Sequence, residues 1–137
     1  MAGRIKTCRF KIHVERGAVE YFQVSIYPTR KRMVVAIRLN EGHPQNKYRN
    51  ACGAFFGYRS MRNDGSPGEF LGHIYLCKRY LGVSTLTHEC VHAALHWGRV
   101  KKVKLSGKSE ERFAGVVGEL VRQIGNRCCS LRVGGWA

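Results

Sequence analysis

The chain has 137 residues, which fits one domain, and its 24 lysines and arginines against nine acids give a net charge of +15. A surface this basic attracts polyanions, so nucleic acid or nucleoprotein is an expected partner. No apolar run is long enough to span a membrane and no apolar signal segment opens the chain. These features exclude a membrane-spanning helix and predict a cytoplasmic protein with no membrane partner.

Three runs near the N-terminus predict β-strands. Apolar and polar residues alternate over residues 8–15 and 19–28, which is the period of a strand with one buried and one wet face. The third run, residues 32–40, is rich in β-branched side chains. The basic stretch at residues 29–32 predicts a hairpin turn between the second and third strands.

Turn-forming residues divide the middle of the chain. Residues 41–50 are polar and predict a loop, while residues 51–61 predict a strand interrupted by glycine. The sequence Asn-Asp-Gly-Ser-Pro-Gly at residues 63–68 is a dense turn signal. A further strand is expected around residues 73–77. Residues 1–80 are therefore predicted to be mainly strands, arranged as an antiparallel sheet.

The hydrophobic period changes after this sheet. Apolar residues recur at helical spacing over residues 83–98 and again over residues 109–125. A basic linker separates the two predicted helices, and residues 128–137 predict a loosely structured tail. Strands followed by helices predict an α+β fold in a single domain that covers residues 1–137.

The first predicted helix carries the order His-Glu-x-x-His at His88, Glu89 and His92. Positions i and i+4 share a helix face, so both imidazoles can bind one ion. Zn²⁺ takes imidazole ligands and can keep one position open for water. Glu89 stands roughly 100° around the helix from His88, where it can take that water's proton as general base. His96, one turn further, is expected beside the site or simply at the surface.

A catalytic zinc ion needs a further protein ligand, and the second predicted helix offers two acids. Glu111 shares its face with three small residues, Ala114, Gly115 and Gly118, which would let the two helices pack closely. This pattern favours Glu111 as the third ligand, with Glu110 as the alternative.

Two segments carry a resemblance to known families. Residues 87–96, THECVHAALH, and residues 110–120, EERFAGVVGEL, resemble the small zinc metallopeptidases that phages and prophages encode. More distantly they are similar to the IrrE/ImmA-type peptidases. The resemblance covers about residues 84–124. It implies a gluzincin-like zincin fold, a Zn²⁺ cofactor held by His88, His92 and an acid of the downstream helix, and a protein or peptide substrate in the bacterial host cytoplasm.

The same resemblance implies a strand that runs along the cleft just before the active-site helix and pairs with extended substrate. Residues 70–78 stand in that place in the sequence, and His73 and Tyr75 are candidates for stabilising the oxyanion.

Two other functions stay open at the level of sequence. Basic runs at residues 4–11, 30–32 and 99–104 suit a nucleic-acid-binding protein whose metal is structural or absent. The second alternative is an inactive zincin fold that binds a host protein.

Overall fold

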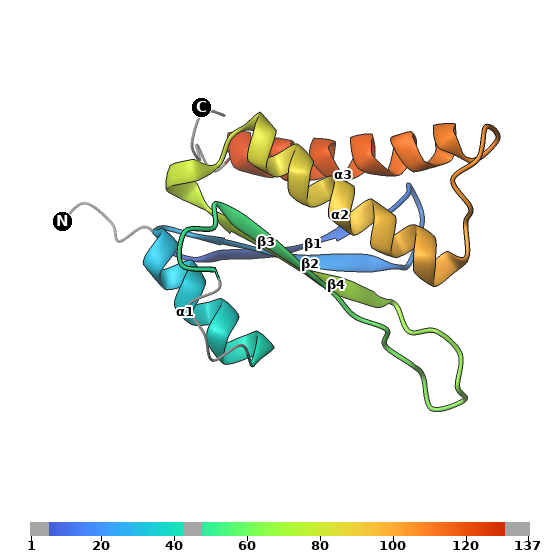
Figure 1. The fold of residues 1–137 in the computed structure, drawn as a ribbon, viewed down its shortest axis with the longest axis horizontal. Coiled ribbons are helices and arrows are strands. Elements are labelled where there is room, and N and C mark those ends of the chain that lie inside the picture. The colour runs from blue at the N-terminus through green and yellow to red at the C-terminus, as the bar shows by residue number, and fades with distance from the viewer. Residues whose placement is uncertain (1–5, 43–47, 131–137) are drawn as a thin grey trace.

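The computed structural model describes residues 6–42 and 48–130, where four strands form one mixed sheet covered by three α-helices (Figure 1). The strands are β1 (Cys8–His13), β2 (Tyr21–Tyr27), β3 (Gly53–Gly57) and β4 (Phe70–Cys77). The helices are α1 (Arg30–Glu41), α2 (Val83–Lys101) and α3 (Glu110–Ser130). The α+β class expected from the sequence is therefore confirmed.

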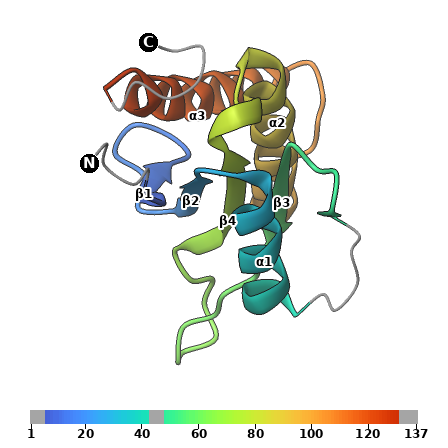
Figure 2. The ribbon, with the colours of Figure 1, turned by 90° about the vertical axis from the view of Figure 1, so that its left-hand side faces the viewer.

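Helices α2 and α3 lie side by side on one face of the sheet, and α1 lies on the other (Figures 1 and 2). The main core fills the space under α2 and α3. Alternate residues of β2, Phe22, Val24 and Ile26, meet Leu86 and Trp97 of α2 there. Burying side chains of this size stabilises the fold by about 1.5–3 kcal/mol each. Alternation in the sequence therefore identified the core face of this strand.

The third predicted strand is wrong, because the chain forms α1 there. The Thr29 hydroxyl accepts a hydrogen bond from the Arg32 backbone N–H at 3.2 Å, which caps the helix start. Gly42 ends it in the left-handed conformation at φ 69°. Met33 and Ile37, four residues apart, are buried against the sheet. Capping and packing together outweigh the strand preference of the β-branched residues.

The predicted antiparallel sheet is wrong for its central pair of strands. The order is β1-β2-β4-β3, and β2 pairs with β4 in parallel, whereas the two outer pairs are antiparallel. A parallel pair needs a long crossover instead of a hairpin, and α1 belongs to that crossover. β4 therefore lies inside the sheet. The expectation that residues 70–78 form the exposed strand of a cleft is wrong, since β3 takes the edge.

The two C-terminal helices are longer than predicted. α2 continues past Gly98, which is buried within it, and ends at Lys101, where the capping residue Lys102 takes a left-handed conformation with φ 57°. α3 includes residues 128–130, which were expected in the tail, and the remainder of that tail lies outside the described residues. In the described chain, no helix combines the length and apolar character needed to cross a membrane.

Replacing Gly72 tests the close approach of β3 and β4. This buried glycine has φ 154°, and a Cβ there would stand 2.5 Å from the Phe56 carbonyl oxygen. We expect Gly72→Ala to lower the free energy of unfolding by about 2–4 kcal/mol, measured by urea denaturation. Gly115→Ala on α3 meets nothing within 4 Å, and should instead raise stability by about 0.5–1 kcal/mol. Equal midpoints for Gly72→Ala and the native chain would contradict this pairing.

Candidate metal centre and a buried polar cluster

α2 presents His88 and His92 together on its exposed side. Their Nε2 atoms are 3.2 Å apart and form a hydrogen bond, and the ring centroids are 4.8 Å apart. The helical spacing i, i+4 explains why the rings converge. The structure thus brings together the two imidazoles that the sequence identified as metal ligands.

Glu89 lies next to this pair but points into the protein. Its side chain is 7% exposed, and its Oε1 atom is 4.0 Å from Nε2 of His88, whose side chain is 67% exposed. Burial raises the pKa of the Glu89 carboxyl above its ordinary value, and the charge of His88 opposes that rise. A desolvated carboxylate therefore sits directly behind an exposed histidine.

The start of β3 packs against α2 beside Glu89. A Cβ at Gly53 would stand 3.2 Å from Glu89 Cγ and 3.3 Å from Thr85 Cγ2, so the absence of a side chain permits this close contact. A pocket of about 260 Å³ opens there, lined by Cys52, Gly53, Ser84, Thr85, His88 and Glu89. Sequence reasoning missed the contribution of Cys52 and Gly53, although a glycine inside a strand often marks a close backbone approach.

His96 has a structural role at the other end of β3. Its Nε2 donates to the Tyr58 carbonyl oxygen at 3.0 Å, and its ring lies 5.7 Å from that of Phe55. Burial lowers the pKa of His96, and the nearby Arg59 and Arg99 lower it further. A neutral, packed imidazole in this position joins the helix to the edge strand.

The structure does not bring Glu111 or Glu110 to the histidine pair. Both are exposed in the first turn of α3. The next residue, Arg112, stacks its guanidinium over Trp97 at 5.0 Å, so this turn meets the C-terminal half of α2. Trp97 is nine residues after His88, which is about 13 Å along the helix axis and about 180° around it. The assignment of Glu111 as third ligand stays a prediction that this arrangement does not favour.

The reason is the antiparallel course of the two helices, which Figure 1 shows. The chain turns back after α2, so the start of α3 lies beside the end of α2. Within residues 6–42 and 48–130, no three His, Cys, Asp or Glu side chains gather closely enough to hold a metal ion. The described site therefore offers two imidazoles and one buried carboxylate.

A second polar cluster lies on the opposite face of the sheet. His73 Nε2 is 2.9 Å from the Ser25 hydroxyl, and its ring stacks on Tyr75 with centroids 4.1 Å apart. The Tyr75 hydroxyl donates to Glu41 Oε1 at 2.8 Å. His73 and Tyr75 thus face α1 and not α2, so their expected role in stabilising an oxyanion beside the metal is wrong.

Serine, histidine and glutamate in this cluster are also the residue types of a nucleophilic triad. Ser25, however, has no exposed surface, and Glu41 Oε1 is 4.0 Å from His73 Nδ1, which is too long for a hydrogen bond. Burial lowers the pKa of His73 to about 4, and the charge of Arg9 acts in the same direction. The cluster therefore connects the end of α1 to the sheet and does not expose a nucleophile.

This cluster makes stability depend on pH. The unfolded His73 binds a proton near pH 6.5, whereas the folded one resists it until about pH 4. The unfolded state therefore gains the proton first, and stability is lost as the pH falls through that window, by about 3 kcal/mol. We expect His73→Gln to reduce this loss in urea titrations at several pH values. His13→Gln, at an exposed position of β1, is the matched control, and an equal loss in all three proteins would contradict the assignment.

Comparisons with protein-family models, with curated proteins and with solved structures find no match to this chain. What the chain can do is therefore inferred from its own residues. Three features of this region could take part in binding or catalysis: the histidine pair, the buried carboxylate next to it and the edge strand with its glycines.

Proposed function

We propose that the chain is a zinc-dependent peptidase in which His88 and His92 supply two of the protein ligands of the metal and Glu89 acts as general base. The 3.2 Å separation of the two Nε2 atoms carries the proposal. Two nitrogen ligands of one tetrahedral zinc ion, each at roughly 2.0–2.1 Å, stand about 3.4 Å apart. The separation of the two nitrogens therefore already fits one ion.

Glu89 supports the proposal through its position. Zinc supplies Lewis-acid activation of water in such sites. The carboxylate is held within 4.0 Å of His88 and is nearly shielded from bulk solvent. A proton taken by Oε1 would stay near the reacting groups. The Glu89 carboxyl could then return it to the leaving amine.

The edge strand favours a peptide as the substrate. Among the described residues β3 pairs with β4 alone, so its outer edge offers backbone donors and acceptors to an extended chain. Gly53 meets Glu89 and Thr85, and Gly57 meets His96, so β3 runs along the histidine-bearing side of α2. A peptide added to β3 would pass directly beside His88. We infer from this a zincin-like arrangement, in which the edge strand flanks the metal-binding helix and would bring substrate and metal together.

Zinc content tests the ligand assignment. We expect one zinc ion per chain by elemental analysis. His88→Ala and His92→Ala should each lower zinc affinity by more than about 100-fold, because even groups that only orient a ligand are worth 10–100-fold. His96→Ala, Glu110→Ala and Glu111→Ala should keep the native affinity. Loss of zinc in Glu111→Ala would instead show that the first turn of α3 reaches the histidines and would overturn the helix arrangement described above.

Glu89→Gln separates an enzyme from a binding protein. The variant should keep zinc, because the amide is isosteric and the imidazoles are unchanged. It should lose peptide hydrolysis by about 10²–10⁴-fold, the range for removal of a general base. The measurement is cleavage of a mixed peptide library by zinc-loaded protein, read by mass spectrometry. Full activity in Glu89→Gln would refute the role of Glu89. A zinc-loaded native chain that cleaves no peptide would refute the peptidase and leave the inactive binder.

A further inference from the structure

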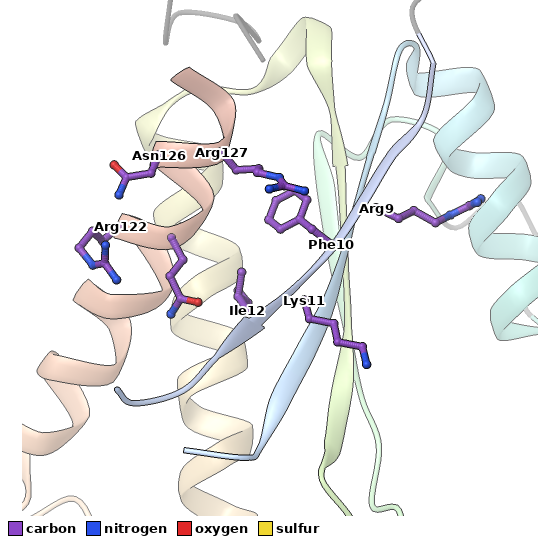
Figure 3. Close-up of a pocket in the computed structure, with 8 residues that line it drawn as sticks. Arg9, Phe10, Lys11, Ile12, Arg122, Asn126 and Arg127 are labelled. Atoms are coloured by element: carbon purple, nitrogen blue, oxygen red, sulfur yellow. The ribbon is translucent and has the colours of Figure 1, made fainter. Parts of the chain in front are cut away.

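A basic cleft of about 690 Å³ lies between β1 and the C-terminal half of α3 (Figure 3). Its charged and polar walls come from the two elements, namely Arg9 and Lys11 of β1, and Arg122, Asn126 and Arg127 of α3. β1 is the sheet edge opposite β3, so the cleft is separate from the histidine pair. The proposed peptidase chemistry does not use it.

β1 supplies an apolar floor on the side of the cleft that faces α3. Figure 3 shows Phe10 and Ile12 reaching from β1 toward α3, while Arg9 and Lys11 extend from the other side of the strand. The Arg127 guanidinium lies 5.2 Å from the centre of the Phe10 ring, which holds this charge over the strand. Positive charge therefore lies on both sides of β1, with Arg127 on the α3 side and Arg9 and Lys11 on the other, and is not gathered at one point.

The spacing of these groups suits an extended polyanion. Arg9 and Lys11 are two residues apart on a strand, which separates them by about 6.6 Å. Arg122 and Asn126 are one helical turn apart, or about 5–6 Å between Cβ atoms. Glu119 accepts hydrogen bonds from Arg122 Nε and Nη2 at 2.9 and 2.5 Å, which uses two of the five N–H groups of the guanidinium. Donors spread along a strand and a helix at this spacing match a chain of phosphates better than a single small anion.

We propose that this cleft binds the phosphate backbone of nucleic acid without reading its sequence. Charge complementarity favours it, since four cations line the cleft in a chain of net charge +15. Arginine and lysine contacts to phosphate position a protein on nucleic acid without sequence information. A membrane surface fits less well, because binding to lipid needs exposed apolar side chains around the charges. Here Ile12 is buried and Phe10 lies under Arg127.

Binding of fluorescein-labelled duplex DNA tests the proposal, measured by anisotropy over a series of salt concentrations with two unrelated sequences. The cleft variant is Lys11→Gln/Arg127→Gln. Its control is Lys31→Gln/Arg32→Gln, which removes the same charge from exposed positions in the first turn of α1. The native chain should bind both sequences alike. The cleft variant should lose at least about tenfold in affinity and about two in the slope of log K against log salt, and the control should change by less than about twofold.

A second cleft variant guards against misfolding. Arg9→Gln/Lys11→Gln leaves α3 unchanged, and its thermal unfolding should match that of the native chain while its DNA affinity falls as in the first variant. His88→Ala should bind DNA as the native chain does, so failure of the zinc site and failure of the cleft are distinguishable.

Three results would overturn the inference. Equal losses in the cleft variants and the control would show that binding follows total charge and not this cleft. Absence of DNA binding in the native chain would refute it directly. Binding to phosphatidylserine vesicles that is lost in the cleft variants, while their DNA affinity is unchanged, would show that the cleft serves a membrane.

Discussion

Parallel pairing of β2 with β4 is the constraint on which the rest of the structure depends. Two adjacent strands that point the same way need a crossover, and α1 begins that crossover on one face of the sheet. The chain then adds β3 at the edge and returns through β4 to the centre. When it leaves β4, the face opposite α1 is available to α2 and α3. The histidine-bearing helix and the free edge of β3 become neighbours as a result.

The two faces of the sheet carry different chemistry. The side under α2 and α3 is an apolar core, whereas the side under α1 contains the hydrogen-bonded group of Ser25, His73, Tyr75 and Glu41. Glu89 belongs to neither group. A carboxylate at 7% exposure beside a histidine, with no arginine or lysine as its partner in the described ion pairs, costs folding free energy. Such a cost in folding free energy is expected at a residue that serves a function, which agrees with the proposed role of Glu89.

Local patterns in the sequence predicted most of the fold but not its long-range arrangement. Period-two alternation located β1 and β2, and helical spacing located α2, because both patterns record burial within one element. The Thr29 cap and Gly42 were visible signals for α1, but the β-branched Val34 and Val35 carried more weight in the sequence-based prediction. The site divides in the same way. The i, i+4 spacing predicts that His88 and His92 converge, as they do. The partner of this pair depends on how α3 returns along α2, which no local pattern records.

Contacts between distant residues account for the remaining misses. Gly53 is 36 positions before Glu89, and nothing in either segment indicates that they touch. The cleft between β1 and α3 joins residues about 110 positions apart, as the hydrogen bonds between His13 and Gln123 show. Its charge could be read from the sequence, since Arg9 and Lys11 belong to an early basic run. That Arg122 and Arg127 line the same cleft required the fold.

Gln123 of α3 binds the edge of the sheet much as a further strand would. Its side-chain amide donates to the His13 carbonyl oxygen at 2.7 Å and accepts from the His13 N–H at 3.0 Å. One glutamine therefore occupies both backbone groups that His13 would offer to an incoming strand, and the neighbouring Arg9 and Lys11 add charge that discourages such pairing. The two edges of the sheet therefore differ in how readily they can pair with a further strand. Self-association or aggregation through strand addition is disfavoured at β1, whereas β3 is the edge that a further strand could extend in the part of the chain that the structure describes.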